Sequence, residues 1–164
     1  MATALQNLSS YDSSTVPLGN GKRIGIVVSE WNTAVTGNLL RGACETLLKF
    51  GVAESDIVIE YVPGSFELTY GAKVLIERGD MDCVIILGCV VQGETPHFTF
   101  VCNGVTQGTV DLNLKYGIPV IFGLLTTDTL DQAKARSGGL HGNKGDEAAI
   151  TALKMIALNE KYSG

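Results

Sequence analysis

The stretch DCVIILGCVVQGETPH, Asp82–His97, combines an apolar run with a turn and the start of a segment of helical length. Its first part, Asp82–Gly88, is typical of a strand buried on both faces of a parallel sheet. The segment that follows, residues 98–116, has the length of a helix and ends at Gly117. This stretch therefore predicts a strand followed by a helix, the unit from which parallel α/β sheets are built.

The same alternation continues on both sides of that stretch. The other predicted strands are Arg23–Ser29, Asp56–Val62 and Pro119–Leu124, and the other predicted helices are 36–50, 66–78, 128–137 and 146–161. Four apolar strands alternating with helices favour a four-stranded open parallel sheet with right-handed crossovers and helices on both faces. We therefore predict an α/β protein, a three-layer α/β/α sandwich.

The length of the chain, 164 residues, is typical of one domain with one hydrophobic core. Residues 23–164 carry all the predicted strands and helices. Residues 1–22 are rich in Ser, Asn and Gly and show little periodic apolar pattern, so we predict a flexible N-terminal arm. The arm has no apolar run of the kind found in signal peptides.

Composition and charge exclude several classes of function. The net charge of −5 and the absence of a basic cluster argue against a nucleic-acid partner. The longest apolar stretches, residues 84–91 and 117–125, are too short to span a bilayer, for which about 20 residues are needed. None of the four cysteines belongs to a CxxC pair, so we expect no metal site and a reducing, cytoplasmic environment.

Chemically rich segments follow all four predicted strands. In open parallel sheets, ligands bind outside the carboxyl ends of the strands, which meet at one edge. We therefore expect a single site that draws on all four loops. These loops are Ser29–Asn32, Pro63–Glu67, Cys89–His97 and Thr126–Asp128.

The segment Gly93–His97 (GETPH) lies at the start of the predicted helix 98–116. The N–H groups and the dipole at a helix start favour an anion. Thr95 is expected to cap this helix. His97 lies in its first turn, where the positive end of the dipole favours a neutral imidazole that exchanges protons near pH 7. The alternative is a histidine that only caps the helix or packs in the core.

A glycine-rich segment, Gly138–Gly145, is predicted to be a loop between two helices and is preceded by Arg136. It lacks the GxxxxGK[ST] register of nucleotide-binding loops. Arg136 as a bidentate donor and Lys144 as a point charge can still hold a small phosphate. The alternative is that each side chain is only a solvent-exposed polar group at a helix end and binds no ligand.

Aromatic side chains follow two of the predicted strands. Trp31, the only tryptophan, lies beside Asn32 and can stack on a planar heterocycle, and Phe66 lies beside Glu67. The alternative is that both rings cover the edge of the core.

Four segments together resemble the 6,7-dimethyl-8-ribityllumazine synthase family, over residues 23–159. They are VPGSFEL (62–68), GCVVQGETPHF (88–98), FGLLTTDT (122–129) and GNKG (142–145). The resemblance implies a flavodoxin-like fold and a transferase of riboflavin biosynthesis that needs no cofactor. Such an enzyme condenses 5-amino-6-(D-ribitylamino)uracil with 3,4-dihydroxy-2-butanone 4-phosphate, and it forms the lumazine, phosphate and water.

The resemblance also implies roles for individual residues. His97 matches the residue that transfers protons, and Arg136 matches the phosphate site, with Lys144 nearby. The butanone phosphate would also be held by Gly93, Glu94 and Thr95. The pyrimidine and its ribityl chain would be held by Trp31, Asn32, Ser65, Phe66, Glu67, Cys89, Val90, Val91 and, from a neighbouring subunit, Phe122.

Four positions differ from the commoner residues of the family. Trp31 stands where many relatives carry Phe, which favours flavin-like ligands, and Gln92 stands where Arg is frequent. Thr99 and Phe100 replace an acidic residue and a Tyr.

The resemblance further implies an assembly of subunits. Members of the family form pentamers with active sites at the subunit interfaces, and some build icosahedral shells of twelve pentamers. An N-terminal arm that adds a strand to a neighbour's sheet and an association with riboflavin synthase are further expectations.

Three other functions remain open from the sequence. One is a catalytically impaired homologue that binds flavin or only forms the shell. Another is a generic nucleotide-binding domain, which the absence of the GxGxxG and Walker patterns disfavours. The third is the pentameric riboflavin synthase, which needs no phosphate site.

Overall fold

The structure is a computed structural model that describes residues 7–162. Its centre is a four-stranded sheet in the order β2-β1-β3-β4, and all three pairings are parallel. This order confirms the predicted parallel sheet and is the one found in flavodoxin-like folds. The strands are β1 (Ile24–Ser29), β2 (Ile57–Val62), β3 (Cys83–Val91) and β4 (Val120–Thr127).

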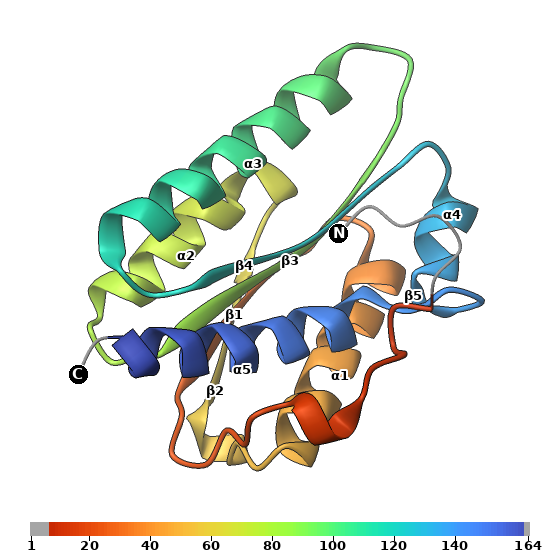
Figure 1. The fold of residues 1–164 in the computed structure, drawn as a ribbon. Helices are drawn as coiled ribbons and strands as arrows, with labels where there is room; N and C mark the ends of the chain where they lie inside the picture. Colours follow the sequence, from red (N-terminus) through yellow and green to blue (C-terminus); the bar gives the residue numbers. More distant parts are fainter. Residues whose placement is uncertain (1–6, 163–164) are drawn as a thin grey trace.

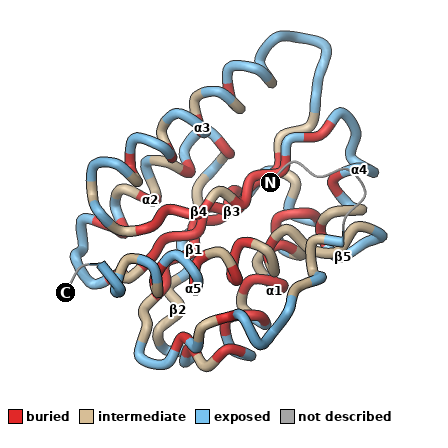
Figure 2. Tube along the Cα trace, viewed as in Figure 1, coloured by how far each residue is buried: buried red, intermediate tan, exposed pale blue. Residues whose placement is uncertain are grey.

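Helices cover both faces of the sheet (Figure 1). One face carries α1 (Thr33–Lys49), α4 (Leu130–Ala135) and α5 (Lys144–Tyr162), and the other carries α2 (Leu68–Glu77) and α3 (His97–Tyr116). Alternate residues of β1 point into two separate apolar cores, Ile26 toward α1 and α5, and Val27 toward α2 and α3. Buried residues are concentrated along β1, β3 and β4 and the facing sides of the helices, whereas β2 is half-buried or exposed (Figure 2). The predicted three-layer sandwich is therefore confirmed.

The strands β3 and β4 end three residues later than predicted, and they pair as far as Val91 and Thr127. The predicted strand ended at Gly88, and glycine commonly weakens or interrupts a strand. Here glycine is required by packing, since a Cβ atom at Gly88 would lie 2.7–2.9 Å from Leu124, Leu68 and the Ser65 hydroxyl. Strand β1 pairs with β3 only as far as Leu87, so the end of β3 extends beyond it.

The segment Gly138–Gly145, predicted as a loop, contains a short antiparallel hairpin. Its strands are β5 (Ser137–Gly139) and β6 (Gly142–Asn143), and α5 begins directly afterwards at Lys144. The loop prediction was wrong because glycine-rich residues carry no periodic pattern that would indicate a strand. The positive φ angles of Gly138 (100°) and Gly142 (77°) are the reason for the glycines at those two places.

The described part of the predicted N-terminal arm, residues 7–22, packs against its own domain and contains a short helix, η1 (Ser13–Thr15), and no strand. Val16 is buried in the core under α1 and α5. The backbone of Leu8 donates to the carbonyl of His141, in the turn between β5 and β6, at 2.7 Å. Residues 1–6 lie outside the described residues, and pairing of the arm with a neighbouring sheet stays a prediction.

Candidate active site

A pocket of about 690 Å³ lies at the carboxyl edge of the sheet. Its walls come from the turn after β1, from the 3-10 helix η3 (Ser65–Glu67), from the end of β3 and from the first turns of α3. Nine predicted site residues meet there: Trp31, Asn32, Ser65, Phe66, Glu67, Cys89, Val90, Val91 and His97. The expected convergence of loops at this edge is therefore observed for three of the four strands.

Asn32 connects two walls of this pocket. It is the only residue other than glycine among those described that has a positive φ angle, 61°. Its side chain does not cap α1 but donates from Nδ2 to the carbonyl of Cys89 on β3, at 2.9 Å. This bond ties the end of β1 to the end of β3. Trp31, directly before it, is 72% exposed, so the backbone at this bend sets where the indole lies.

The second wall is η3, which holds Phe66 and Glu67. The ring of Phe66 lies against α3, since a Cβ atom at Gly104 would be 2.9 Å from Phe66 Cε2. The Glu67 carboxylate and the indole both lie near Gly64, where a Cβ atom would be 2.9 Å from Glu67 Oε2 and 3.7 Å from Trp31 Cδ1. Two exposed aromatic rings and a carboxylate therefore line one pocket.

The third wall is the end of β3. Burial raises the pKa of the Cys89 thiol to about 11, so this thiol is protonated near neutral pH. A protonated, buried thiol is a poor nucleophile. The Cys89 carbonyl faces the side of β1, where it accepts from Asn32. Neighbouring residues of a strand direct their amide groups to opposite sides, so the amide groups of Val91, two positions after Cys89, face the side of β1 as well. They lie beyond the last residue of β3 that pairs with β1.

His97 is the first residue of α3 and is exposed at the pocket. Its predicted place at a helix start is confirmed. The prediction that Thr95 caps this helix was wrong, because the cap position is Pro96 and it makes no side-chain cap bond. Gly93, Glu94 and Thr95 are exposed in the connection between β3 and α3 and are not among the residues that line the pocket.

Arg136 and Lys144 lie apart from this pocket and next to each other. The backbone N–H of Lys144 donates to the carbonyl of Arg136 at 2.8 Å. The Arg136 guanidinium donates to the carbonyl of Gln132 at 3.1 Å, and Lys144 Nζ lies 2.6 Å from Glu147 Oε1. Both cations are half-buried. Arg136 directly follows α4, and Lys144 is the first residue of α5.

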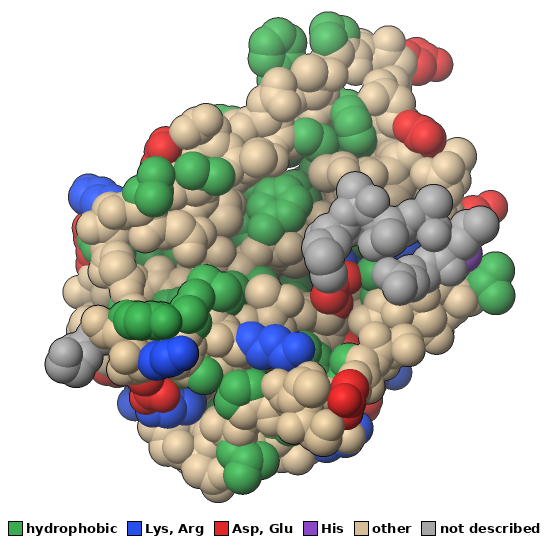
Figure 3. All heavy atoms as spheres, in the orientation of Figure 1, with side chains coloured by type: hydrophobic (Ala, Val, Ile, Leu, Met, Phe, Trp, Pro, Cys, Tyr) green, Lys and Arg blue, Asp and Glu red, His purple; other side chains and the backbone are tan. Residues whose placement is uncertain are grey.

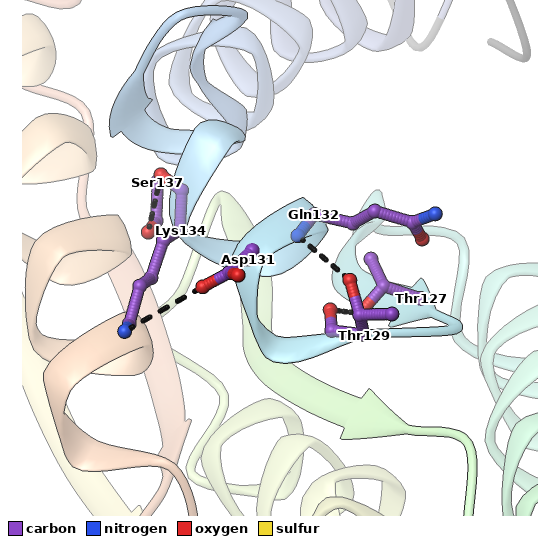
Figure 4. A network of polar contacts seen from close by, with 6 residues as sticks. All are labelled: Thr127, Thr129, Asp131, Gln132, Lys134 and Ser137. Carbon is purple, nitrogen blue, oxygen red and sulfur yellow. Dashed lines mark hydrogen bonds and ion pairs between the residues drawn. The ribbon is translucent and has the colours of Figure 1, made fainter.

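A polar network fixes α4, the helix that leads to Arg136 (Figure 4). The Thr129 hydroxyl caps the helix by accepting from the Gln132 backbone at 3.2 Å. The Thr127 hydroxyl, at the end of β4, donates to the Thr129 carbonyl at 3.0 Å. Through this network the end of β4 determines where α4 begins, and with it the place of Arg136.

Phe122 lies on β4, one of the two edge strands of the sheet, and packs half-buried against the core under α2 and α3. It does not line the pocket of its own chain. Of the predicted binding residues, Phe122, Arg136 and Lys144 are thus on a different part of the surface from Trp31 and His97.

Three pocket residues were not predicted: Gly64, Phe100 and Val101. Phe100 and Val101 follow His97 by three and four positions, and this helical spacing places them on the same face of α3. That spacing could have identified both. In the part of the chain that the structure describes, no cluster of His, Cys, Asp or Glu could hold a metal ion, and no helix could span a membrane.

Comparison with known proteins adds a family match that covers this whole region. The family model described as 6,7-dimethyl-8-ribityllumazine synthase matches residues 21–160. A protein of that name from Parabacteroides distasonis is 62% identical over 156 residues, which are 95% of this chain and 98% of the relative. Proteins of the same name from Porphyromonas gingivalis and Phocaeicola vulgatus are each 56% identical, over 96% and 98% of this chain and 98% and 96% of the relatives. The matched residues include the pocket as well as Arg136 and Lys144.

Proposed function

Because the chain belongs to the 6,7-dimethyl-8-ribityllumazine synthase family, we propose that its pocket binds the pyrimidine substrate of this reaction. The enzyme is a transferase that condenses 5-amino-6-(D-ribitylamino)uracil with 3,4-dihydroxy-2-butanone 4-phosphate. The observation that carries the proposal is the pocket itself, which combines exposed aromatic rings, polar side chains and one histidine at the edge where parallel sheets bind ligands. The names of the relatives support catalysis rather than an impaired homologue.

The pyrimidine ring stacks on Trp31, the most exposed aromatic ring of the pocket, and its edge meets the end of β3. The amide groups of Val91 face that side and can pair with the polar edge of the ring, as a neighbouring strand would. Ser65 and Glu67 receive the hydroxyl groups of the ribityl chain. Ser65 is buried and its hydroxyl donates to the Ser29 hydroxyl at 3.5 Å, so the Ser65 oxygen can accept a hydrogen bond from the substrate.

His97 moves protons during the condensation. The 5-amino group attacks the ketone and loses water to form an imine, phosphate then leaves, and the ribitylamino nitrogen closes the ring with loss of a second water. Each step requires a proton to be delivered or removed at nitrogen or oxygen. His97 stands at the wall of the pocket, exposed and at the first turn of α3, where its imidazole can reach such atoms.

Arg136 holds the phosphate of the second substrate, and Lys144 supports it. A guanidinium offers two parallel N–H donors to phosphate oxygens, and the backbone bond between Arg136 and Lys144 keeps both cations together. Glu94 and Thr95 extend this site from the loop before α3. Since Arg136, Lys144 and Phe122 are not in the pocket of their own chain, they complete the pocket of an adjacent subunit.

A pentamer would bring these two parts of the site together. Support comes from the surface around β4, where hydrophobic side chains lie along α3 and α5 and in the hollow between them (Figure 3). Exposed apolar residues there include Val110, Leu114, Met155 and Leu158. Apolar patches of this kind are typical of subunit interfaces. Packing of pentamers into a shell, entry of the N-terminal arm into a neighbouring sheet and association with riboflavin synthase stay predictions, as does the cytosolic location, which the free cysteines support.

Sedimentation velocity tests the assembly. We expect no monomer at micromolar concentration, and either a pentamer or a shell of twelve pentamers, because the active site is otherwise incomplete. A stable monomer that forms the lumazine at the same rate would contradict the shared site.

The activity is tested directly with the purified protein and both substrates. We expect lumazine absorbance and released phosphate to rise in equal amounts and faster than in the uncatalysed reaction. Product that appears only at the uncatalysed rate would indicate the impaired homologue. Riboflavin formed from the lumazine alone would indicate a riboflavin synthase.

A further inference from the structure

One side chain, Asn143, joins three separate segments directly beside Lys144. Its Nδ2 donates to the carbonyl of Asn38 on α1 at 2.9 Å, and its Oδ1 accepts from the backbone N–H of Gly145 at 2.8 Å. Its own backbone N–H donates to the Ser9 hydroxyl at 2.9 Å. Asn143 therefore connects the β5–β6 hairpin with α1, with the first turn of α5 and with the N-terminal segment.

The amide of Asn143 has little freedom to move, because it packs against the backbone of α1. A Cβ atom at Gly42 would lie 2.5 Å from Asn143 Nδ2 and 2.7 Å from its Cγ. Only glycine at position 42 leaves this space open. The bond to Gly145 also acts as an N-terminal cap for α5, whose first residue is Lys144.

The position of Asn143 bears directly on both phosphate-binding cations. Residue 143 pairs with Ser137 in the hairpin, and the next backbone bond joins Lys144 to Arg136 at 2.8 Å. Arg136 and Lys144 are thus the residues that flank this pairing. A shift of Asn143 relative to α1 would move both cations together.

We propose that Asn143 is a positioning residue for the butanone phosphate, an inference that rests on the proposed function of Arg136 and Lys144. It acts through these two cations and does not touch the substrate. Ser9 contributes from the N-terminal segment by holding the backbone of the same residue. A specific effect on the phosphate substrate follows, because the pyrimidine pocket is built from other segments.

The test compares variants of the assembled enzyme by their Michaelis constants for each substrate. We expect Asn143→Ala to raise the KM for the butanone phosphate about tenfold, since two hydrogen bonds of ordinary strength are lost, and to change the KM for the pyrimidine by less than about twofold. Asn143→Ser keeps a short hydroxyl that can cap α5 but does not reach α1, so its effect is intermediate. If Asn143→Ala does not fold, Asn143→Ser is used for the test in its place.

Two further variants serve as controls. Asn38→Ala leaves the backbone carbonyl that accepts from Asn143, and both Michaelis constants should stay unchanged. Arg136→Ala should raise the KM for the butanone phosphate. If it does not, the assigned phosphate site is wrong, and so is the positioning role. Inorganic phosphate, used as a competitive inhibitor, should bind Asn143→Ala about tenfold more weakly than the unaltered enzyme.

A rise confined to the phosphate substrate and to inorganic phosphate supports the proposal. Equal changes in both Michaelis constants, or a lower melting temperature with neither constant changed, would show a purely structural role and overturn it. If the unaltered protein forms no lumazine, the proposed function fails. Calorimetry with inorganic phosphate then still tests the positioning role of Asn143. Equal phosphate affinities of Asn143→Ala and the unaltered protein would refute that role.

Discussion

Replacement of His97 by alanine is expected to lower kcat by about 10²–10⁴-fold, the usual contribution of a general acid–base group. Every bond change in the proposed condensation involves a proton, and His97 is the only histidine that lines the described pocket. Turnover should nevertheless stay above the uncatalysed reaction, because holding two substrates together contributes separately to the rate. The Michaelis constants should change little, since the pyrimidine contacts belong to other side chains.

Steady-state kinetics with both substrates measures this effect. Asn103→Ala is the matched control, because Asn103 is exposed on the same helix and does not line the pocket. That variant should keep the kcat of the unaltered enzyme. An unchanged kcat in His97→Ala would remove the proton-transfer role. Complete loss of turnover would show that His97 does more than move protons.

Replacement of Gly145 by alanine is expected to lower the free energy of unfolding by about 3 kcal/mol or more, at the upper end of the cost of overpacking. A Cβ atom there would lie 1.9 Å from the carbonyl oxygen of Leu39 and 3.0 Å from the backbone nitrogen of Ala43. Both contacts are with the backbone of α1, so no side-chain rotation relieves them. The helices α1 and α5 would have to separate along the core that Leu39 and Leu153 fill.

Gly37→Ala is the matched control, since Gly37 also lies within a helix but has nothing within 4 Å of its Cβ position. Alanine is favoured over glycine in a helix by about 1 kcal/mol, so this variant should be more stable than the unaltered protein. Denaturant or thermal unfolding at one fixed protein concentration should therefore give changes of opposite sign. Unchanged stability of Gly145→Ala would mean that α1 and α5 are less closely packed than the structure indicates.

The main features of the fold could be predicted because they depend on local pattern. The apolar run of Asp82–Gly88 identified the central strand, and the same kind of run identified the other three. The place of His97 followed from a strand, a turn and a helix in direct succession. Errors arose where packing overrides local preference. The strand β3 continues through Gly88, where a glycine is needed because there is no room for a side chain. The hairpin Ser137–Asn143 forms from residues without a periodic pattern.

The candidate site divides in the same way. That loops after β1, β2 and β3 meet at one edge was predictable, because the carboxyl ends of parallel strands always lie together. The separation of Arg136 from His97 within one chain was not, because Arg136 follows α4, which covers the face of the sheet opposite to α3, and only the folded chain shows which face a helix covers.

The sequence by itself thus determined the order of strands and helices, the sheet that they form and the edge at which the candidate site lies. Periodicity and turn residues act over a few positions, and such local signals are enough to predict these features. Only the tertiary structure decided how the walls of the site are held in place. The bond from Asn32 to Cys89 spans 57 positions and that from Asn143 to Asn38 spans 105, and both end on backbone carbonyls. Every residue has such a carbonyl, so the pattern of side chains in the sequence cannot predict which carbonyl accepts the bond.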